Sequence, residues 1–397
     1  MAVPAGSAGS PRTTPLAALG WGFYLAVSWT WVIGMVLPAF LLRDFGWWSL
    51  AVFLVPNAIG AALMGTVLRD AGAAQRLRAR HDRAVRWFSM VTIAFHLFVL
   101  GAVGLSVPGL PDAVGQKGVL IIATIFALVL LALRRWLITA LLVWLASLGL
   151  GLAYALGGSS AVLDNTQVFG GGFPRDLLLL MPVVVFGFAL CPYLDATFLR
   201  ARASTGPTEG RLAFAFGFLV PFVIMIGFTV VYAGAMVSGH AIGWSLVLVH
   251  LALQGGFTLA VHLRESGLSV PERGMTLALV LGALMAMWAL PAGPIEWADG
   301  MLAWEVVYRA FLSAYGLFFP AYVLYAIVPG ALKLGPMPRA GRLVAAITMA
   351  LVLPMYGMGF IARREEWLPL ALGLILAGAF ITFTMRRRAE SGSMEHG

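Results

Sequence analysis

The chain has 397 residues, of which 61% are hydrophobic and only 11% are charged. Soluble domains usually carry roughly 25% charged residues, so this composition argues against a water-soluble enzyme or a nucleic-acid-binding protein. A membrane span needs about 20 residues, and twelve spans would leave roughly 150 residues for all loops and both ends. That is too little for a folded domain outside the membrane, and we expect the protein to act inside the bilayer.

Twelve apolar stretches are each long enough to cross a bilayer as a helix. In chain order they cover approximately residues 17–42, 46–68, 87–107, 117–133, 136–157, 177–199, 212–237, 241–263, 274–293, 301–328, 343–362 and 367–385. Residues 1–15 are rich in Ala, Gly, Ser and Pro and are expected to be a disordered tail, with a cleavable signal peptide as the alternative. Residues 389–397 are also expected to be a short disordered tail.

The net charge of +9 is explained by where the basic residues fall. With the N-terminus in the cytoplasm, 20 Lys and Arg lie in cytoplasmic segments and five on the other side, while Arg309 lies within a span. Cytoplasmic loops of membrane proteins carry an excess of Lys and Arg. This distribution predicts that both termini are cytoplasmic. It also explains the basic net charge without a nucleic-acid partner, and we expect none. We expect a multi-pass protein of the inner or plasma membrane, whose oligomeric state the sequence leaves open.

An internal repeat is indicated by three pairs of spans. Span 2 contains Phe-Leu-Val-Pro at residues 53–56, and span 7 contains the same four residues at 218–221. Spans 3 and 8 each carry a mid-membrane histidine, and spans 1 and 6 are each interrupted by Gly and Pro. Pairing span 1 with 6, 2 with 7 and 3 with 8 implies a repeat of five spans. Because five is odd, the second copy enters the membrane inverted.

This arrangement resembles the amino acid–polyamine–organocation superfamily, whose type is the LeuT fold. The resemblance rests on topology and on two stretches, 28–35 in span 1 and 186–195 in span 6. It implies an all-α polytopic membrane protein of about twelve helices, with a five-plus-five inverted repeat plus two. The corresponding parts are the first repeat 16–157, an extracytoplasmic loop 158–176, the second repeat 177–328 and two accessory helices 329–388.

The resemblance also implies that both stretches are unwound near the midplane. Gly tolerates non-helical backbone and Pro removes a helix hydrogen bond, and the freed polar groups require partners at membrane depth. A plain proline kink in each helix is the alternative. A solute site is expected between spans 1, 3, 6 and 8. Its candidate residues are Trp29, Thr30, Trp31, Gly34, His96, Phe188, Cys191, Tyr193, His250 and Gln254.

Intramembrane polar residues are costly in hydrocarbon and usually face the protein interior. Asp195 lies in the cytoplasmic half of span 6 and is a candidate for binding a coupling ion or proton, or for ordering an inner gate. A simple pairing with Arg200 or Arg202 is the alternative. His96 and Thr258 are further candidates for coupling, and His96 is equally able to hydrogen-bond a neighbouring backbone group. The resemblance places a sodium-binding hydroxyl pair on span 8, and only Thr258 fits it. Coupling to Na⁺, to H⁺ or to neither therefore remains open.

Four charged residues form a candidate outer gate. Glu305 and Arg309 are four residues apart on span 10 and share one helix face, while Arg43 and Asp44 close span 1 on the same side. The alternative is a self-contained Glu305–Arg309 pair that neutralises itself. The single cysteine, Cys191, excludes an internal disulfide and a cysteine-based metal cluster, and we expect neither a metal nor a cofactor.

Together these features predict a secondary transporter that moves a small polar or amphipathic solute by alternating access. Two rival classes remain: a six-plus-six transporter of the major facilitator type, and a transporter-like sensor that binds a ligand without moving it. The loop at 65–72 only partly resembles the major facilitator motif, since Arg69 precedes Asp70. An intramembrane enzyme is not expected, because no His-Glu-x-x-His or Gly-x-Ser-x-Gly motif occurs.

Overall fold

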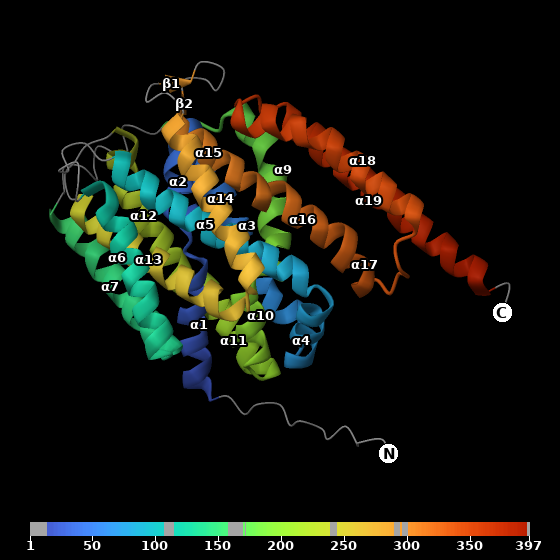
Figure 1. Ribbon diagram of the computed structural model, residues 1–397, viewed down its shortest axis with the longest axis horizontal. Coiled ribbons are helices and arrows are strands. Elements are labelled where there is room, and N and C mark those ends of the chain that lie inside the picture. Colours follow the sequence, from blue (N-terminus) through green and yellow to red (C-terminus); the bar gives the residue numbers. More distant parts are fainter. Residues whose placement is uncertain are drawn as a thin grey trace.

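The computed structural model describes residues 14–106, 115–157, 170, 172–238, 244–289, 294–295 and 301–394. These residues form a bundle of helices, with one short antiparallel pair of strands, β1 (Pro294–Ile295) and β2 (Met301–Leu302), at one end (Figure 1). Within this part of the chain nine helical segments are long and apolar enough to cross a membrane, and ten when one bent pair counts as a single span. The predicted all-α polytopic membrane architecture is confirmed. The count of twelve spans and the side of each terminus stay predictions.

The predicted spans 1 to 5 all coincide with helices. In chain order these helices are α1 (Pro15–Trp29), α2 (Val32–Phe45), α3 (Trp48–Val67), α4 (Ala71–Arg80), α5 (Asp82–Ser106), α6 (Gly115–Leu133) and α7 (Trp136–Gly157). Helices α1 and α2 form the bent pair, with 58° between them, and together they cover predicted span 1. Helix α4 lies outside the predicted spans. Its first turn is capped by Asp70, whose carboxylate accepts a hydrogen bond from the backbone N–H of Ala73 at 2.7 Å.

The predicted spans 6 to 12 coincide with the remaining helical segments, three of which are π-helical (η3, η4 and η5) and one a 3₁₀ turn (η1). They are α9 (Arg175–Leu190), η1 (Cys191–Leu194), α10 (Ala196–Ala203), α11 (Pro207–Leu219), α12 (Pro221–Ser238), α13 (Trp244–Glu265), α14 (Val270–Ala289), α15 (Ala303–Ser313), η3 (Ala314–Phe318), α16 (Phe319–Tyr322), η4 (Val323–Ile327), α17 (Val328–Ala331), α18 (Arg339–Tyr356), η5 (Gly357–Ile361) and α19 (Trp367–Met394).

The structure corrects the predicted tail 389–397, because α19 is helical through Met394. No proline interrupts this stretch, so the helix continues past the end of the apolar segment. Most of the predicted N-terminal tail and of the loop 158–176 lies outside the described residues.

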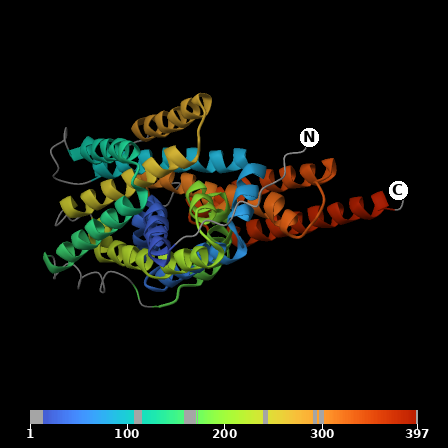
Figure 2. The ribbon, with the colours of Figure 1, turned by 90° about the horizontal axis from the view of Figure 1, so that it is seen from below.

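Packing in the bundle joins the two halves of the chain rather than keeping them apart. Helix α1 packs against α11 and α2 against α12, while α3 packs against both α9 and α11. Helix α13 is central and contacts α5, α6 and α7. Helices α18 and α19 pack against each other along one edge of the bundle, and the view from below shows the pair extending away from the other helices (Figures 1 and 2).

Prolines inside helical spans each leave one backbone carbonyl without its usual partner four residues later, and at three of them the partner is on another helix. Tertiary contacts satisfy all three carbonyls. Pro38 frees the carbonyl of Gly34, which accepts from Thr229 Oγ1 at 2.9 Å. Pro320 frees that of Gly316, which accepts from the Tyr356 hydroxyl, and Pro329 frees that of Tyr325, which accepts from Arg386 Nη2 at 2.9 Å. An unsatisfied carbonyl costs roughly several kcal/mol in lipid. These three bonds therefore help to determine which helices face one another.

Candidate functional site

Span 1 breaks within the predicted stretch 28–35, at Thr30 and Trp31, which separate α1 from α2. Gly34 and Pro38, which were expected to interrupt the span, lie inside α2. The first backbone groups of α2 find partners on other helices. His96 Nδ1 donates to the Thr92 carbonyl at 2.8 Å, so its Nε2 is free to accept from the Val32 N–H at 3.4 Å. The Tyr308 hydroxyl donates to the Val32 carbonyl at 3.1 Å. His96 therefore caps the broken helix, and its ring nitrogens are both engaged.

The predicted interruption in span 6 is confirmed at η1 and Asp195, between α9 and α10. Asp195 Oδ1 caps α10 by accepting from the Thr197 N–H at 2.7 Å. Thr197 Oγ1 lies 2.7 Å from the same carboxylate oxygen and 3.2 Å from Ser28 Oγ in the last turn of α1. The two interrupted spans thus touch each other through Ser28, Thr197 and Asp195.

A cavity with a volume of about 70 Å³ lies beside both interruptions. Its walls come from spans 1, 6, 10 and 11, and they are almost entirely aromatic and aliphatic. Four of the ten predicted solute-binding residues line it: Trp29, Trp31, Phe188 and Cys191. Tyr315, Gly316, Tyr356 and Phe360 also line it, and the sequence did not single them out. The lining supports contact with an apolar group.

The other predicted solute-binding residues lie outside the cavity lining. The Thr30 hydroxyl donates back to the Ala26 carbonyl at 2.8 Å. Gly34 faces Ile226, where a β-carbon would lie 3.0 Å from the isoleucine side chain. Tyr193 is half-buried in η1.

His250 and Gln254 are fully buried on α13 and do not line the cavity. The His250 ring packs on Phe228 with 4.7 Å between ring centroids. Gln254 Nε2 donates to Ser147 Oγ at 2.9 Å. The hydroxyl of Thr258, the predicted sodium ligand, donates to the Gln254 carbonyl at 3.0 Å. These polar groups therefore join spans 5, 7 and 8 rather than enclosing the cavity.

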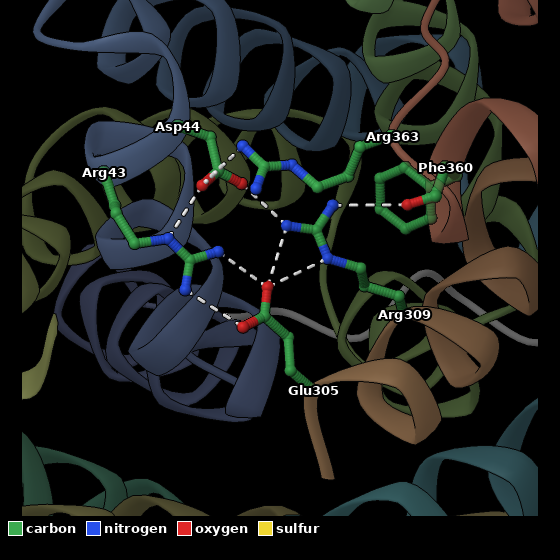
Figure 3. A network of polar contacts seen from close by, with 6 residues as sticks. All are labelled: Arg43, Asp44, Glu305, Arg309, Phe360 and Arg363. Carbon is green, nitrogen blue, oxygen red and sulfur yellow. Dashed lines mark hydrogen bonds and ion pairs between the residues drawn. The ribbon is translucent and has the colours of Figure 1, made fainter. Parts of the chain in front are cut away.

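The four residues of the predicted outer gate are brought together in one network (Figure 3). Arg43 binds Glu305 with both terminal nitrogens, at 2.7 and 3.0 Å. Arg309 Nη2 lies 2.7 Å from Asp44 and 2.9 Å from Glu305. The Glu305–Arg309 pair is thus not self-contained, because each member also binds α2. Such two-point contacts between guanidinium and carboxylate are among the strongest polar contacts in proteins.

Arg363, which the sequence analysis did not include, completes the network from the loop after η5. Its Nη2 lies 3.2 Å from Asp44, and its φ of +55° is an uncommon, strained conformation for a residue other than glycine. Gly46 ends α2 with φ +68°, and a β-carbon there would lie 2.2 Å from the Gly170 carbonyl oxygen. Only glycine permits this tight exit from α2, two residues after Asp44.

The network lies over the predicted outer end of the cavity. Leu41 and Leu312 line the cavity from the helices that carry Asp44 and Arg309, and Phe360 lines it from η5, three residues before Arg363. The Phe360 carbonyl itself accepts from Arg309 Nη1 at 3.2 Å (Figure 3). Separating α2 from α15 at this end would therefore break ion pairs directly beside the cavity.

His262 is a further polar residue that the sequence analysis missed. It is fully buried near the end of α13, and its Nε2 lies 4.0 Å from Asp195 Oδ2. One signal was available: His250, Gln254, Thr258 and His262 follow one another at intervals of four residues and share one face of the helix.

Neither alternative partner of Asp195 pairs with it. Arg200 lies 3.8 Å from Glu265, and Arg202 donates to backbone carbonyls that include Leu68 at 2.6 Å. Within the described residues no group of three or more His, Cys, Asp and Glu side chains is placed to hold a metal ion. Comparison of the chain with family models and with curated proteins finds no match.

Proposed function

We propose that the chain is a secondary transporter of a small amphipathic solute that works by alternating access, rather than an enzyme. The observation that carries the proposal is the meeting of two interrupted spans at one apolar cavity, beneath a closed network of ion pairs. A solute in this cavity contacts both interruptions, so its binding can change the angle between the helical halves. Breaking the network then opens the cavity toward the predicted outer side.

A five-plus-five inverted repeat is part of the same proposal. Under the pairing of spans 1–5 with spans 6–10, a contact in one half has a counterpart in the other. The packing of α1 on α11 corresponds to that of α9 on α3, and α6 on α13 corresponds to α14 on α5. The packing of α7 on α1 corresponds to that of η3 on α9. These matched contacts support a repeat of five and leave α18 and α19 as the accessory pair, in a protein of the inner or plasma membrane.

The cavity lining supports a solute that carries an apolar group. Trp29 and Trp31 point their indole N–H groups elsewhere, to Asn57 Oδ1 and to the Ser28 carbonyl. A ligand in the cavity therefore contacts the faces and edges of the two indole rings rather than their N–H groups. Burial of apolar surface provides about 25 cal/mol per Å², so such a site gains affinity mainly from the apolar part of its ligand.

Uptake into proteoliposomes tests this proposal, with radiolabelled amines and carboxylic acids that bear a phenyl or indole group as probes. The wild type is expected to accumulate at least one of them, and Trp29→Phe to transport it less well. Trp367→Phe is the matched control, because that side chain lies at the start of α19, away from the cavity, and is 37% exposed. Saturable binding of a probe without any uptake would refute the transporter and favour the sensor.

A further inference from the structure

Two buried polar atoms in the core face each other and lack hydrogen-bond partners: Asp195 Oδ2 and His262 Nε2. They are 4.0 Å apart, and both side chains are 0% exposed. A distance of 4.0 Å is too long for a hydrogen bond. Buried polar groups in proteins are nearly always satisfied. Other buried atoms of the described residues are also unpaired, but those of His250 lie among aromatic rings, whereas Asp195 Oδ2 and His262 Nε2 face each other.

Both side chains are held in place by their other contacts. Asp195 Oδ1 is engaged by Thr197 at 2.7 Å, and His262 Nδ1 lies 3.2 Å from Ser89 Oγ. The His262 ring also packs edge-on against Trp31, with 5.6 Å between centroids. The free atoms are therefore directed at each other by three different helices, and the pair lies directly beneath the break in span 1.

The charge of the pair is not compensated by the nearest basic side chains, since Arg200 lies beside Glu265 and Arg202 is bound to backbone carbonyls. With a neutral imidazole the pair carries one negative charge in a buried site, which is costly. We propose that Asp195 and His262 together form a site for one exchangeable proton.

The proton comes from water and binds either to Asp195 Oδ2 or to His262 Nε2. The pair then consists of a carboxylic acid and a neutral imidazole, or of a carboxylate and an imidazolium. In both cases the charge of the pair changes from −1 to 0, and the proton supplies the missing hydrogen bond after a closure of about 1 Å. Release returns the proton to water and restores the negative charge.

The donor set favours a proton over a sodium ion. Hard cations such as Na⁺ prefer several oxygen ligands, whereas here one free carboxylate oxygen faces a ring nitrogen. The hydroxyl of Thr258, one turn before His262 on α13, is turned toward the Gln254 carbonyl.

The other titratable groups around the pair are Tyr24 on α1, His96 on α5, Cys191 in η1 and Tyr315 in η3. Three of them are engaged elsewhere: His96 with Thr92 and Val32, Cys191 with the Tyr315 carbonyl and the Tyr315 hydroxyl with Thr92. Tyr24 is buried with its hydroxyl unpaired. Glu265, one turn after His262, is paired with Arg200 and Arg264.

The position of the site gives the proton a mechanical role. Asp195 is the joint between η1 and α10, and it reaches α1 through Thr197 and Ser28. Neutralising it changes the attraction between α10 and α13 at the point where both interrupted spans meet. Proton coupling in this form rests on the proposed transport function, whereas proton binding by the pair does not.

Infrared difference spectroscopy of the full-length protein in lipid vesicles tests proton binding without any transport measurement. The sample is titrated from about pH 5 to about pH 9, which spans ordinary imidazole values and raised carboxyl values. The expected result is one titrating carboxyl or imidazolium band that disappears in Asp195→Asn. In His262→Gln an imidazolium band is expected to be lost, whereas a carboxyl band is expected to titrate about one pH unit or more lower, because the carboxyl proton has lost its hydrogen-bond acceptor.

Asp195→Asn retains an oxygen for capping α10, and His250→Gln is the matched control for removing a buried histidine. The ring nitrogens of His250 are also buried and unpaired, but the ring packs on Phe228 and Tyr232, so the control is expected to keep the wild-type titration. A titration unchanged in Asp195→Asn or in His262→Gln would overturn the proposal. The proposal would also be overturned if the midpoint of the pH titration shifted when Na⁺ in the buffer is replaced by K⁺. Proton binding by a protein that fails every uptake assay would refute transport and leave the site standing.

Discussion

Asp44 is the most heavily paired carboxylate of the outer network, and its neutralisation in Asp44→Asn is expected to open the cavity. Its side chain is 2% exposed and contacts three arginines: Arg43 at 2.7 Å, Arg309 at 2.7 Å and Arg363 at 3.2 Å. Asparagine preserves the shape of the side chain but not its charge. The three guanidinium groups then share the single carboxylate of Glu305.

The size of the effect follows from the exposure of each pair. Arg43 and Arg363 are 30% and 25% exposed, so their pairs contribute about 0.2–1 kcal/mol each. Arg309 is 8% exposed, and its charge-assisted bond contributes about 1.5–3 kcal/mol. The asparagine oxygen retains part of this, and the closed arrangement loses about 2–3 kcal/mol. At 1.4 kcal/mol per factor of ten, the open population rises by about 30- to 140-fold.

Cys191 provides the assay, because it is the single cysteine of the sequence and lines the cavity with 3% of its surface exposed. A membrane-impermeant thiol reagent is added from outside to oriented proteoliposomes, and the rate of modification is compared with the wild type. The rate is expected to rise by the same factor as the open population. Cys191→Ser gives the background, and Glu272→Gln removes a carboxylate that pairs with Arg86 on other helices. An unchanged rate in folded Asp44→Asn would refute the idea that this network closes the cavity.

Three further predictions concern packing and helix ends. In Gly60→Ala the new β-carbon would lie 2.5 Å from the Phe188 carbonyl oxygen, so we expect overpacking to cost about 1–3 kcal/mol in a denaturation assay, and wild-type stability would contradict this close approach. Arg202 donates to the carbonyls of Leu68 and Arg69 at the end of α3, and Arg202→Met leaves them without their donor. We expect a cost of about 1–3 kcal/mol for each carbonyl, measured against the exposed Arg342→Met. Glu272 accepts from the Ser269 N–H at 2.6 Å in a capping box, and this bond lowers the pKa of the Glu272 carboxyl. The stabilisation from this bond is present above the ordinary pKa of glutamate and is lost as the pH falls through the lowered pKa. The stability difference between wild type and Glu272→Gln should therefore shrink on acidification, and a difference that grows would contradict this reasoning.

The interruptions and the charged gate were the parts of the candidate site that sequence reasoning located well. Pro192 lies at the interruption of span 6, whereas Gly34 and Pro38 lie inside α2, just after the break in span 1. Charged residues at the ends of apolar spans are costly to leave unpaired, which favours contacts among them. The cavity does not lie where a solute site was expected. The predicted walls were spans 1, 3, 6 and 8, whereas the cavity is lined by residues of spans 1, 6, 10 and 11. Aromatic residues such as Tyr356 and Phe360 look like ordinary lipid-facing or core residues until the packing of α18 is known.

The composition and charge of this sequence determine by themselves a bundle of apolar helices. The hydrophobic effect and the need to satisfy backbone groups in lipid act on each segment separately, so the segments and their weak points can be read locally. Which distant group satisfies each freed carbonyl depends on packing between segments far apart in the chain. Thr229 reaches Gly34, and His262 faces Asp195, only because α12 and α13 pack beside the interrupted spans. Only the tertiary structure decides these pairings, because a buried polar group constrains the distance to its partner and not the number of residues between them.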